Sequence, residues 1–304
     1  MQTRNPISLD GKVAVVTGSG RGLGFEFAQS LALAGASVVV NDIDEAAVEQ
    51  AVAAIRKVGG QAVGECVAVG TSEAADRLVA KAVDAFGRLD ILCANAGILR
   101  DRVLWKLSDE DFDSVIATHL RGTFTCARAA VQQMRLQGTP GRLILVASPA
   151  GQRGNPGQTA YAAAKAGIAA CARTWAMECA KAGITVNAIV PVALTQMLAT
   201  IPSLAPLVDA AARGERLPDS IRKSAGMGPP SDVAPLVTFL ASDEASHITG
   251  QCVGLGGDKL SLWSHPREIA IAINDGGWTT EAIAQLWPTT IGHQLESIGL
   301  PPMP

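Results

Sequence analysis

An apolar run passes directly into a glycine-rich loop at Val13-Ala14-Val15-Val16-Thr17-Gly18-Ser19-Gly20-Arg21-Gly22-Leu23-Gly24. This order predicts a buried strand, a tight turn and the beginning of a helix. Glycines permit the turn and a close backbone approach, and the amino end of a helix attracts phosphate. The stretch therefore predicts a dinucleotide site, although glycines at this spacing can also form an ordinary turn.

Further short apolar runs alternate with alanine-rich amphipathic segments along the chain. The runs lie at residues 38–40, 91–94, 143–146 and 185–190, and helices are expected from about Gly24 and Glu45. Near-continuous apolar strands are typical of a parallel sheet that is buried on both faces. The pattern predicts an α/β fold with a doubly wound parallel sheet, Rossmann-like, in a single domain.

The composition stays even to about Lys259, so this domain is expected to span residues 1–259. Within it, residues 192–230 are irregular and are expected to form a flap of loop and short helix. Residues 260–304 are expected to be a C-terminal extension. Its apolar run at residues 268–273 predicts burial, either on the flap of the same subunit or on a neighbouring subunit.

The composition of the 304 residues limits the possible partners. With 48% hydrophobic residues and a net charge of −3, the chain is expected to be globular with a sizeable core. Lys and Arg form no dense cluster, which argues against nucleic acid or an anionic membrane as the main partner. The six cysteines form no CxxC pair, and no apolar segment resembles a signal peptide or a membrane span. We expect a cytoplasmic protein that acts on a small molecule, without a metal site.

Two charged residues bear on the choice of cofactor. Asp42 follows the second apolar run, where a carboxylate can accept from both ribose hydroxyls and repel a 2′-phosphate. Alternatively, Asp42 only begins a turn or caps the next helix. Arg21 can in principle pair with a 2′-phosphate, or it is simply solvated. We predict NAD as the cofactor, with NADP as the alternative.

Tyr161 is the only tyrosine of the chain, and it lies four residues before Lys165. Residues at this spacing share one face of a helix, so the ammonium group can lower the pKa of the phenol. To lower the phenol pKa from about 10 to about 7, the phenolate must be stabilised relative to the phenol by roughly 4 kcal/mol. The alternative is an ordinary amphipathic pair.

Four motifs occur in a fixed order: the TGxxxGxG loop, Cys93-Ala94-Asn95-Ala96-Gly97, Ser148, and Tyr161-x3-Lys165. With them, residues 8–259 resemble the short-chain dehydrogenase/reductase family. The resemblance implies that Tyr161 is the acid/base, that Lys165 holds the nicotinamide ribose and lowers the Tyr161 pKa, and that Ser148 binds the substrate oxygen. Ser148 can otherwise be only a helix cap.

The resemblance also implies a set of cofactor-binding residues. They are Gly18, Gly20, Arg21, Gly22, Leu23, Gly24, Asp42, Asn95, Ala96, Gly97, Tyr161, Lys165, Pro191 and Thr195. Three positions depart from the usual family pattern. His119 stands where an N-x-x-G segment normally has Asn, Pro191-Val192 replaces Pro-Gly, and Val69-Gly70 replaces an Asp. We count His119 among the candidate catalytic residues, because it can hydrogen-bond as the Asn does; the alternative is a packed core histidine.

The stretches at residues 97–102, 108–111, 119–124 and 154–158 narrow the resemblance. They look like the hydroxyacyl-CoA dehydrogenase domain of peroxisomal multifunctional enzyme type 2 and its bacterial single-domain relatives. These enzymes oxidise (3R)-hydroxyacyl-CoA thioesters with NAD, and several accept 17β-hydroxysteroids. Two alternatives stay open: an NADPH-dependent reductase of 3-oxoacyl thioesters or other ketones, and a non-catalytic module that senses a dinucleotide.

The helix expected at residues 159–181 carries many small side chains, which let another helix approach closely. In the family this helix usually forms a subunit interface. We therefore expect a homo-oligomer, a tetramer or a dimer, unless the small face packs only on its own sheet.

Overall fold

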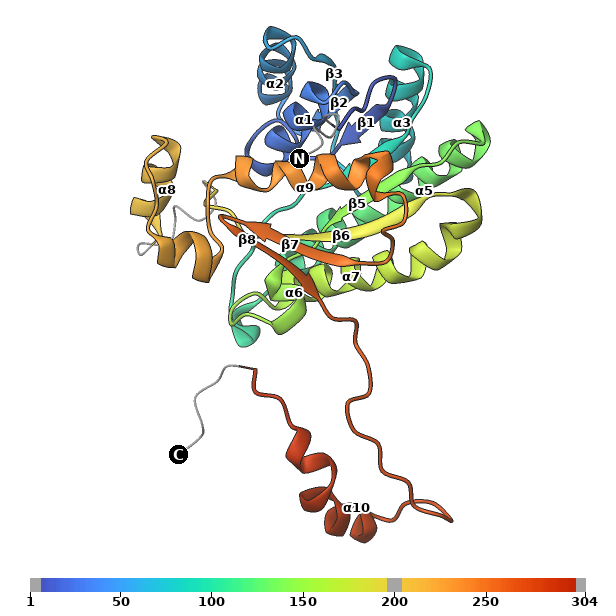
Figure 1. Ribbon diagram of the computed structural model, residues 1–304, viewed down its shortest axis with the longest axis vertical. Coiled ribbons are helices and arrows are strands. Elements are labelled where there is room, and N and C mark those ends of the chain that lie inside the picture. Colours follow the sequence, from blue (N-terminus) through green and yellow to red (C-terminus); the bar gives the residue numbers. More distant parts are fainter. Residues whose placement is uncertain (1–6, 196–203, 299–304) are drawn as a thin grey trace, which may run out of the picture. The chain divides into compact units, whose positions relative to one another are not determined.

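The structure is a computed structural model that describes residues 7–195 and 204–298. An eight-stranded sheet runs through the centre in the order β3-β2-β1-β4-β5-β6-β7-β8 (Figure 1). Its strands are β1 (Val13–Val16), β2 (Ser37–Asp42), β3 (Gln61–Cys66), β4 (Ile91–Ala94), β5 (Arg142–Val146), β6 (Thr185–Pro191), β7 (Cys252–Gly256) and β8 (Lys259–Trp263). Neighbouring strands are parallel up to β7, and β8 is antiparallel to it. The doubly wound α/β fold is confirmed.

Helices cover both faces of the sheet. Along the described residues the helices are α1 (Gly22–Leu33), α2 (Glu45–Lys57), α3 (Ser72–Phe86), α4 (Asp109–Ile116), α5 (Gly122–Gln137), α6 (Pro149–Arg153), α7 (Thr159–Cys179), α8 (Ala205–Ala212), α9 (Ala234–Ala241) and, after the last strand in the chain, α10 (Thr280–Leu286). Helices α1, α2 and α9 pack on one face, and α3, α5 and α7 on the other. None of the helices in the described ranges is long and apolar enough to cross a membrane.

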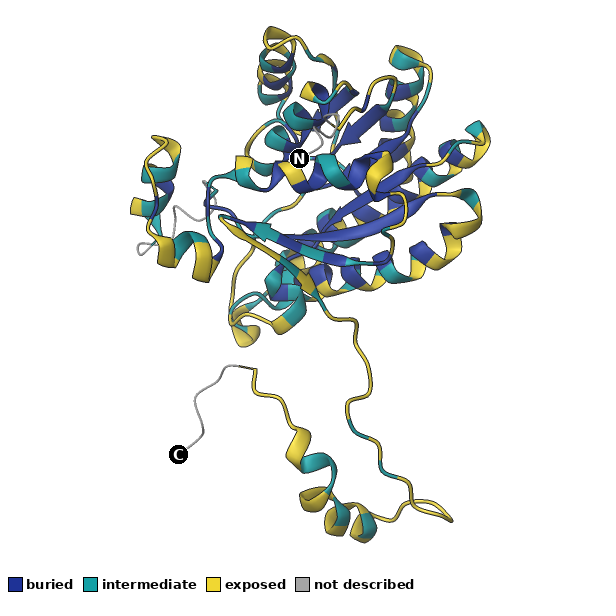
Figure 2. Ribbon diagram, viewed as in Figure 1, coloured by how far each residue is buried: buried dark blue, intermediate teal, exposed yellow. Residues whose placement is uncertain are grey.

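The strand alternation explains why two cores form. Ala14 and Val16 of β1 face the layer of α1 and α9, whereas Val13 and Val15 face the layer of α3 and α5. All four side chains are buried, as in the other central strands (Figure 2). A buried side chain of this size contributes about 1.5–3 kcal/mol through the hydrophobic effect. The continuous apolar runs of the sequence are thus required by a sheet covered on both faces.

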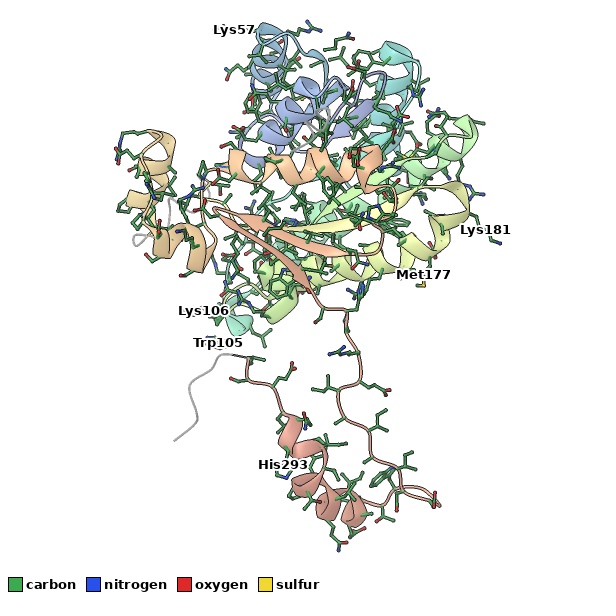
Figure 3. The ribbon with its side chains drawn as sticks, viewed as in Figure 1. Lys57, Trp105, Lys106, Met177, Lys181 and His293 are labelled. Atoms are coloured by element: carbon green, nitrogen blue, oxygen red, sulfur yellow. The ribbon has the colours of Figure 1, made fainter. Side chains whose placement is uncertain are left out.

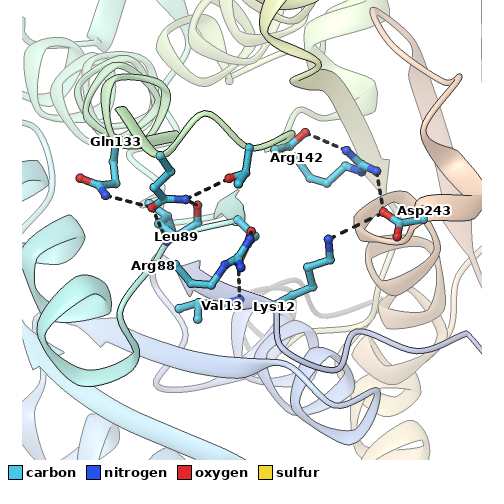
Figure 4. Close-up of polar contacts among 11 residues, drawn as sticks. Lys12, Val13, Arg88, Leu89, Gln133, Arg142 and Asp243 are labelled. Atoms are coloured by element: carbon cyan, nitrogen blue, oxygen red, sulfur yellow. Dashed lines mark hydrogen bonds and ion pairs between the residues drawn. The ribbon is translucent and has the colours of Figure 1, made fainter. Parts of the chain in front are cut away.

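A polar network closes the sheet at the amino ends of β1, β4 and β5 (Figure 4). The buried Asp90 accepts from the Val13 backbone N–H (2.9 Å) and from Arg88 (2.6 and 2.8 Å). Arg142, also buried, donates to Asp243 at 3.1 Å. These charges lie at the amino ends of the strands. The candidate site lies at the opposite edge of the sheet, at the carboxyl ends of the strands.

The chain divides after Trp263 into two compact units, Met1–Trp263 and Ser264–Pro304. Residues 259–263, four of which we expected in the extension, instead form the edge strand β8. The second unit contains α10, and its apolar run is exposed: Ile269, Ile271 and Ile273 are 52%, 72% and 84% accessible. Of the expected flap, residues 196–203 lie outside the described ranges; the remainder contains α8 and a π-helical turn at Ser220–Ala225.

Candidate active site

The glycine loop after β1 is fixed against the end of β4. Gly18 has a φ of +60°, and a Cβ atom there would lie 2.7 Å from the Ala96 Cα, so no other residue fits without displacement. The Asn95 side-chain amide donates to the carbonyl oxygens of Thr17 and Gly18, at 3.0 and 2.9 Å. The Thr17 hydroxyl accepts from the Ala96 N–H in return. Asn95, Ala96 and the loop thus form one rigid cradle.

A second connection joins the loop to β2 through residues that the sequence analysis missed. The buried Ser19 hydroxyl donates to the Val16 carbonyl oxygen at 2.6 Å and accepts from the Asn41 N–H at 3.0 Å. The Asn41 side-chain amide continues to the carbonyl oxygens of Glu65 and Val67. No sequence signal marks these roles, because Ser and Asn occur in any loop. They hold Gly20 and the first turn of α1, with Gly22, Leu23 and Gly24, at the carboxyl ends of the strands.

Asp42 begins the turn after β2, which was one of the two roles predicted for it, and its role at the ribose stays a prediction. Its Oδ1 accepts from the backbone N–H groups of Ile43 and Asp44, which shapes the turn. Its Oδ2 accepts from the Gly20 N–H at 3.2 Å, which places the carboxylate beside the glycine loop. Arg21 is not simply solvated, because its Nη2 donates to the Asp44 carboxylate at 2.9 Å.

Ser148 and Tyr161 meet at the carboxyl end of β5. Ser148 caps α6, since its hydroxyl accepts from the Ala150 N–H at 3.2 Å. The same hydroxyl hydrogen-bonds Tyr161, and this contact lowers the phenol pKa. Lys165, one turn further along α7, has its Nζ 5.6 Å from the centre of the Tyr161 ring. The three residues that the sequence singled out are therefore brought together.

Burial, however, acts against the expected ionisation of Tyr161. It raises the pKa of the phenol more than the contact with Ser148 lowers it, and the negative charge of Asp101 raises it further. Lys165 is 3% exposed, and burial lowers its pKa to about 7. Its Nζ donates to the Val146 carbonyl oxygen at 2.5 Å. Because burial disfavours its charged form, Lys165 supplies less positive field at Tyr161 than the spacing alone suggested.

His119 lies in a π-helical turn, Ala117–Arg121, that leads into α5. Its Nε2 is 2.7 Å from the carbonyl oxygen and 2.9 Å from the backbone nitrogen of Ile98, so it either donates to the one or accepts from the other. Its ring stands edge-on to Tyr161, with centroids 5.2 Å apart. Burial and the charge of Lys165 lower the His119 pKa to about 3. The imidazole is therefore neutral at physiological pH.

Gly97 explains how this histidine fits. A Cβ atom at residue 97 would lie 2.2 Å from the His119 Cε1, so only glycine admits the ring. The His119 Nδ1 is buried and has no hydrogen-bond partner within residues 7–195 and 204–298. His119 is therefore a buried, packed histidine that also hydrogen-bonds the backbone after Gly97, and its predicted catalytic role stays a prediction.

The segment after Ile98 is tied to the start of α7. The Arg102 N–H donates to the Gly157 carbonyl oxygen at 2.8 Å, and the Gln158 side chain donates to Asp101 at 2.9 Å. Trp105, on the short turn that follows, is 81% exposed and points outward (Figure 3). The two hydrogen bonds of Arg102 and Asp101 hold the segment close to the start of α7, the helix that carries Tyr161.

The family described as short chain dehydrogenase matches residues 12–203, which is more than half of the chain. The chain belongs to the short-chain dehydrogenase family. It is an NAD(P)-dependent oxidoreductase that acts on CH–OH groups, as the sequence predicted.

Among its relatives, hydroxyacyl-CoA dehydrogenase ChsB1 of Mycobacterium tuberculosis is 41% identical over 277 residues, which cover 87% of this chain and 83% of that protein. Peroxisomal multifunctional enzyme type 2 of Mus musculus is 42% identical over 156 residues, 48% of this chain and 21% of that longer protein. The crystal structure of a short chain dehydrogenase from Mycobacterium avium has a TM-score of 0.80 and 34% identity, over 97% of this chain and 98% of that one. The predicted similarity to the dehydrogenase of multifunctional enzyme type 2 is confirmed.

The two remaining predicted residues of this short-chain dehydrogenase lie at the end of β6 and just beyond it. Pro191 ends the strand, and Thr195 follows an isolated bridge between Ala193 and Gly228. Both are partly buried at the carboxyl edge of the sheet, where α/β folds bind their ligands. Their role in binding the cofactor stays a prediction.

Proposed function

We propose that this short-chain dehydrogenase is an NAD-dependent enzyme that interconverts a secondary alcohol and a ketone. The observation that carries the proposal is the meeting of Ser148, Tyr161 and Lys165 beside the glycine cradle. A hydroxyl that hydrogen-bonds a phenol, with an amine 5.6 Å from the centre of the phenol ring, suits proton transfer to and from a substrate oxygen.

In the proposed reaction, Tyr161 accepts the proton of the substrate hydroxyl during oxidation and returns it during reduction. Ser148, held by its own bond to Ala150, orients the substrate oxygen. Lys165 holds the nicotinamide ribose, and the neutral His119 keeps the backbone after Gly97 in place. The nicotinamide supplies the site for the hydride, and its oxidised ring carries a positive charge. That charge would oppose the effect of burial on the Tyr161 pKa.

The residues around the loop fit a dinucleotide. Gly18 leaves a close approach open, and the amino end of α1 follows the loop at Gly22. The preference for NAD is supported by Asp42, whose carboxylate lies beside Gly20 and would repel a 2′-phosphate. The NADPH alternative rested on Arg21, which is engaged by Asp44.

For the substrate, we propose a bulky apolar alcohol, either a 3-hydroxyacyl-CoA or a 17β-hydroxysteroid. The support comes from the relatives, since ChsB1 is named a hydroxyacyl-CoA dehydrogenase. The flap offers weaker support, because Leu194, Val208 and Leu217 are buried against one another.

The first test is the change in nicotinamide absorbance with NAD or NADP and a panel of substrates. The panel contains a (3R)-hydroxyacyl-CoA, a 17β-hydroxysteroid and a short secondary alcohol, with Tyr161→Phe as the control. We expect turnover with NAD that the variant loses. Activity confined to small polar alcohols or sugars would refute the substrate class, and a preference for NADP would refute the cofactor. NAD binding without any turnover would favour the sensing module.

We also propose that the enzyme is a homo-oligomer, a tetramer or a dimer, that associates through α5 and α7. Phe124 on α5 is 42% exposed, and Met177 on α7, which Figure 3 labels, is 75% exposed; exposed apolar side chains of this kind suit a face between subunits. A monomer in light scattering at micromolar concentration would contradict this.

A cytoplasmic location stays a prediction, for which cell fractionation is the test.

The residues after Trp263 are proposed to bury their apolar run on the flap of the same subunit or on a neighbour. Truncation before Ser264 separates the two, because it leaves β8 paired with β7. A change in the KM for substrate at constant mass would indicate the same subunit, and a change in mass a neighbour. If neither changes, the proposed burial is wrong.

A further inference from the structure

The pair of Arg21 and Asp44 lies at the rim of the glycine loop. Arg21 follows Gly20, whose N–H donates to Asp42, and Asp44 lies two residues after Asp42. The distance from the Arg21 Nη2 to the Asp44 Oδ2 is 2.9 Å, and this is the only ion pair of Arg21 within the described parts of the chain. Both carboxylates of the Asn41-Asp42-Ile43-Asp44 stretch therefore bear on the loop.

Asp44 is held in place for this contact. Its Oδ1 caps α2 by accepting from the Ala47 N–H at 3.2 Å, which leaves Oδ2 for Arg21. A side chain fixed by a cap loses less freedom when it forms an ion pair than a free one does. The Arg21 and Asp44 side chains are 70% and 43% exposed, so the pair adds little to folding stability.

A weak pair can still decide which dinucleotide binds. A 2′-phosphate needs a cation close by, and Arg21 is the cation that this loop offers. To use it, the phosphate would have to displace Asp44 from the guanidinium and approach the Asp44 charge. Asp42 repels the phosphate directly, whereas Asp44 acts by occupying Arg21.

On this basis, which rests on the proposed use of NAD, we propose that Asp44 is a positioning residue for cofactor specificity. Its carboxylate occupies the Arg21 guanidinium and so keeps this cation from binding the 2′-phosphate of NADP.

The test is the Kd of NAD and of NADP, measured by tryptophan fluorescence quenching at low ionic strength. Asp44→Asn keeps the cap, because Asn is as good an N-cap as Asp, and removes the charge. We expect it to tighten NADP binding by about tenfold, which corresponds to 1.4 kcal/mol, and to leave NAD binding nearly unchanged. When Asp44→Asn is introduced into the Arg21→Ala variant, the Kd of NADP should not change, because the guanidinium that Asp44 occupies is absent.

Glu45→Gln is the matched control, since it removes an equal charge from the first turn of α2 without a recorded contact to Arg21. Three results would overturn the inference: an equal gain in Glu45→Gln, a gain that persists without Arg21, or no gain in Asp44→Asn. If neither dinucleotide binds the wild-type protein, the proposed function itself fails.

Discussion

Replacement of Lys165 by Met should stabilise the protein at neutral and acidic pH. The ammonium is buried, and its pKa falls from the ordinary value of 10.5 to about 7 in the folded state. A difference of this size corresponds to about 5 kcal/mol between the charged and neutral forms. Below pH 7 the folded protein bears this whole cost, because Lys165 is protonated in both the folded and the unfolded chain.

The variant also loses an interaction. The Lys165 Nζ donates to the Val146 carbonyl oxygen, and leaving that oxygen without a partner costs about 1–3 kcal/mol. The expected net gain for Lys165→Met is therefore about 2–4 kcal/mol at pH 7 and below. Between pH 7 and 10.5 the unfolded chain binds more protons than the folded one, so the wild-type protein becomes more stable as the pH rises. The advantage of the variant should disappear over this range.

The assay is urea unfolding followed by tryptophan fluorescence, at about pH 6.5 and about pH 9.5, with fixed protein concentration. Lys181→Met is the control, since Lys181 is exposed just beyond the end of α7 (Figure 3). This change should alter the free energy of unfolding by less than about 0.5 kcal/mol at either pH. A variant at residue 165 that is destabilised at pH 6.5, or whose effect does not depend on pH, would refute the argument from burial.

Three further outcomes follow from the site and the network. Gly97→Ala should lower the free energy of unfolding in urea by about 1–3 kcal/mol, because the new methyl group meets the His119 ring. The same substitution should cost less when it is made in a His119→Ala background. An equal cost in both backgrounds would exclude the clash as the cause. Asp90→Asn should cost about 1–3 kcal/mol in the same assay, because the buried carboxylate loses its charge and one of the two oxygens that accept from Arg88 and the Val13 N–H. Asp243→Asn should cost below about 1 kcal/mol, because its side chain is 81% exposed and Arg142 keeps its bonds to the Ser242 and Gly141 carbonyl oxygens; similar values for both variants would contradict the structure. The ultraviolet phenolate absorbance of Tyr161, the only tyrosine, should titrate above its ordinary pKa in the free protein and at a lower pH with NAD bound; titration at or below the ordinary value in the free protein would disprove the effect of burial.

The features that could be predicted are those encoded within a few neighbouring residues. The run Val13–Val16 and the glycines after it give a strand, a turn and a helix in sequence order, and the structure has all three. Ser148 and Tyr161 could be placed because each follows a recognisable strand or helix signal. Local patterns of this kind do not depend on which element packs next to which.

The strand β8 could not be predicted in the same way. Its sequence, Lys259-Leu260-Ser261-Leu262-Trp263, is short, and Leu260 and Leu262 are each 68% exposed. An antiparallel edge strand needs only one neighbour, so it lacks the continuous apolar run that marks the buried strands. The roles of Ser19 and Asp44 were missed for a related reason, since each depends on a partner that is more than 20 residues away in the sequence.

The ionisation of the Tyr161 and Lys165 pair shows most clearly what spacing cannot give. A spacing of four residues on a helix places the two groups together, but the sequence does not reveal that Lys165 would be buried and Tyr161 partly buried. Burial penalises both charged forms, so the lysine pKa falls to about 7 while the tyrosine pKa rises above its ordinary value. As the pH increases, Lys165 therefore loses its proton before Tyr161 does. Its side chain is then a largely neutral amine at the pH at which the Tyr161 phenolate would form. A second positive charge is then needed for Tyr161 to act as a base near neutral pH. In the proposed reaction the oxidised nicotinamide is the group that carries such a charge, so NAD should bind before the alcohol is deprotonated.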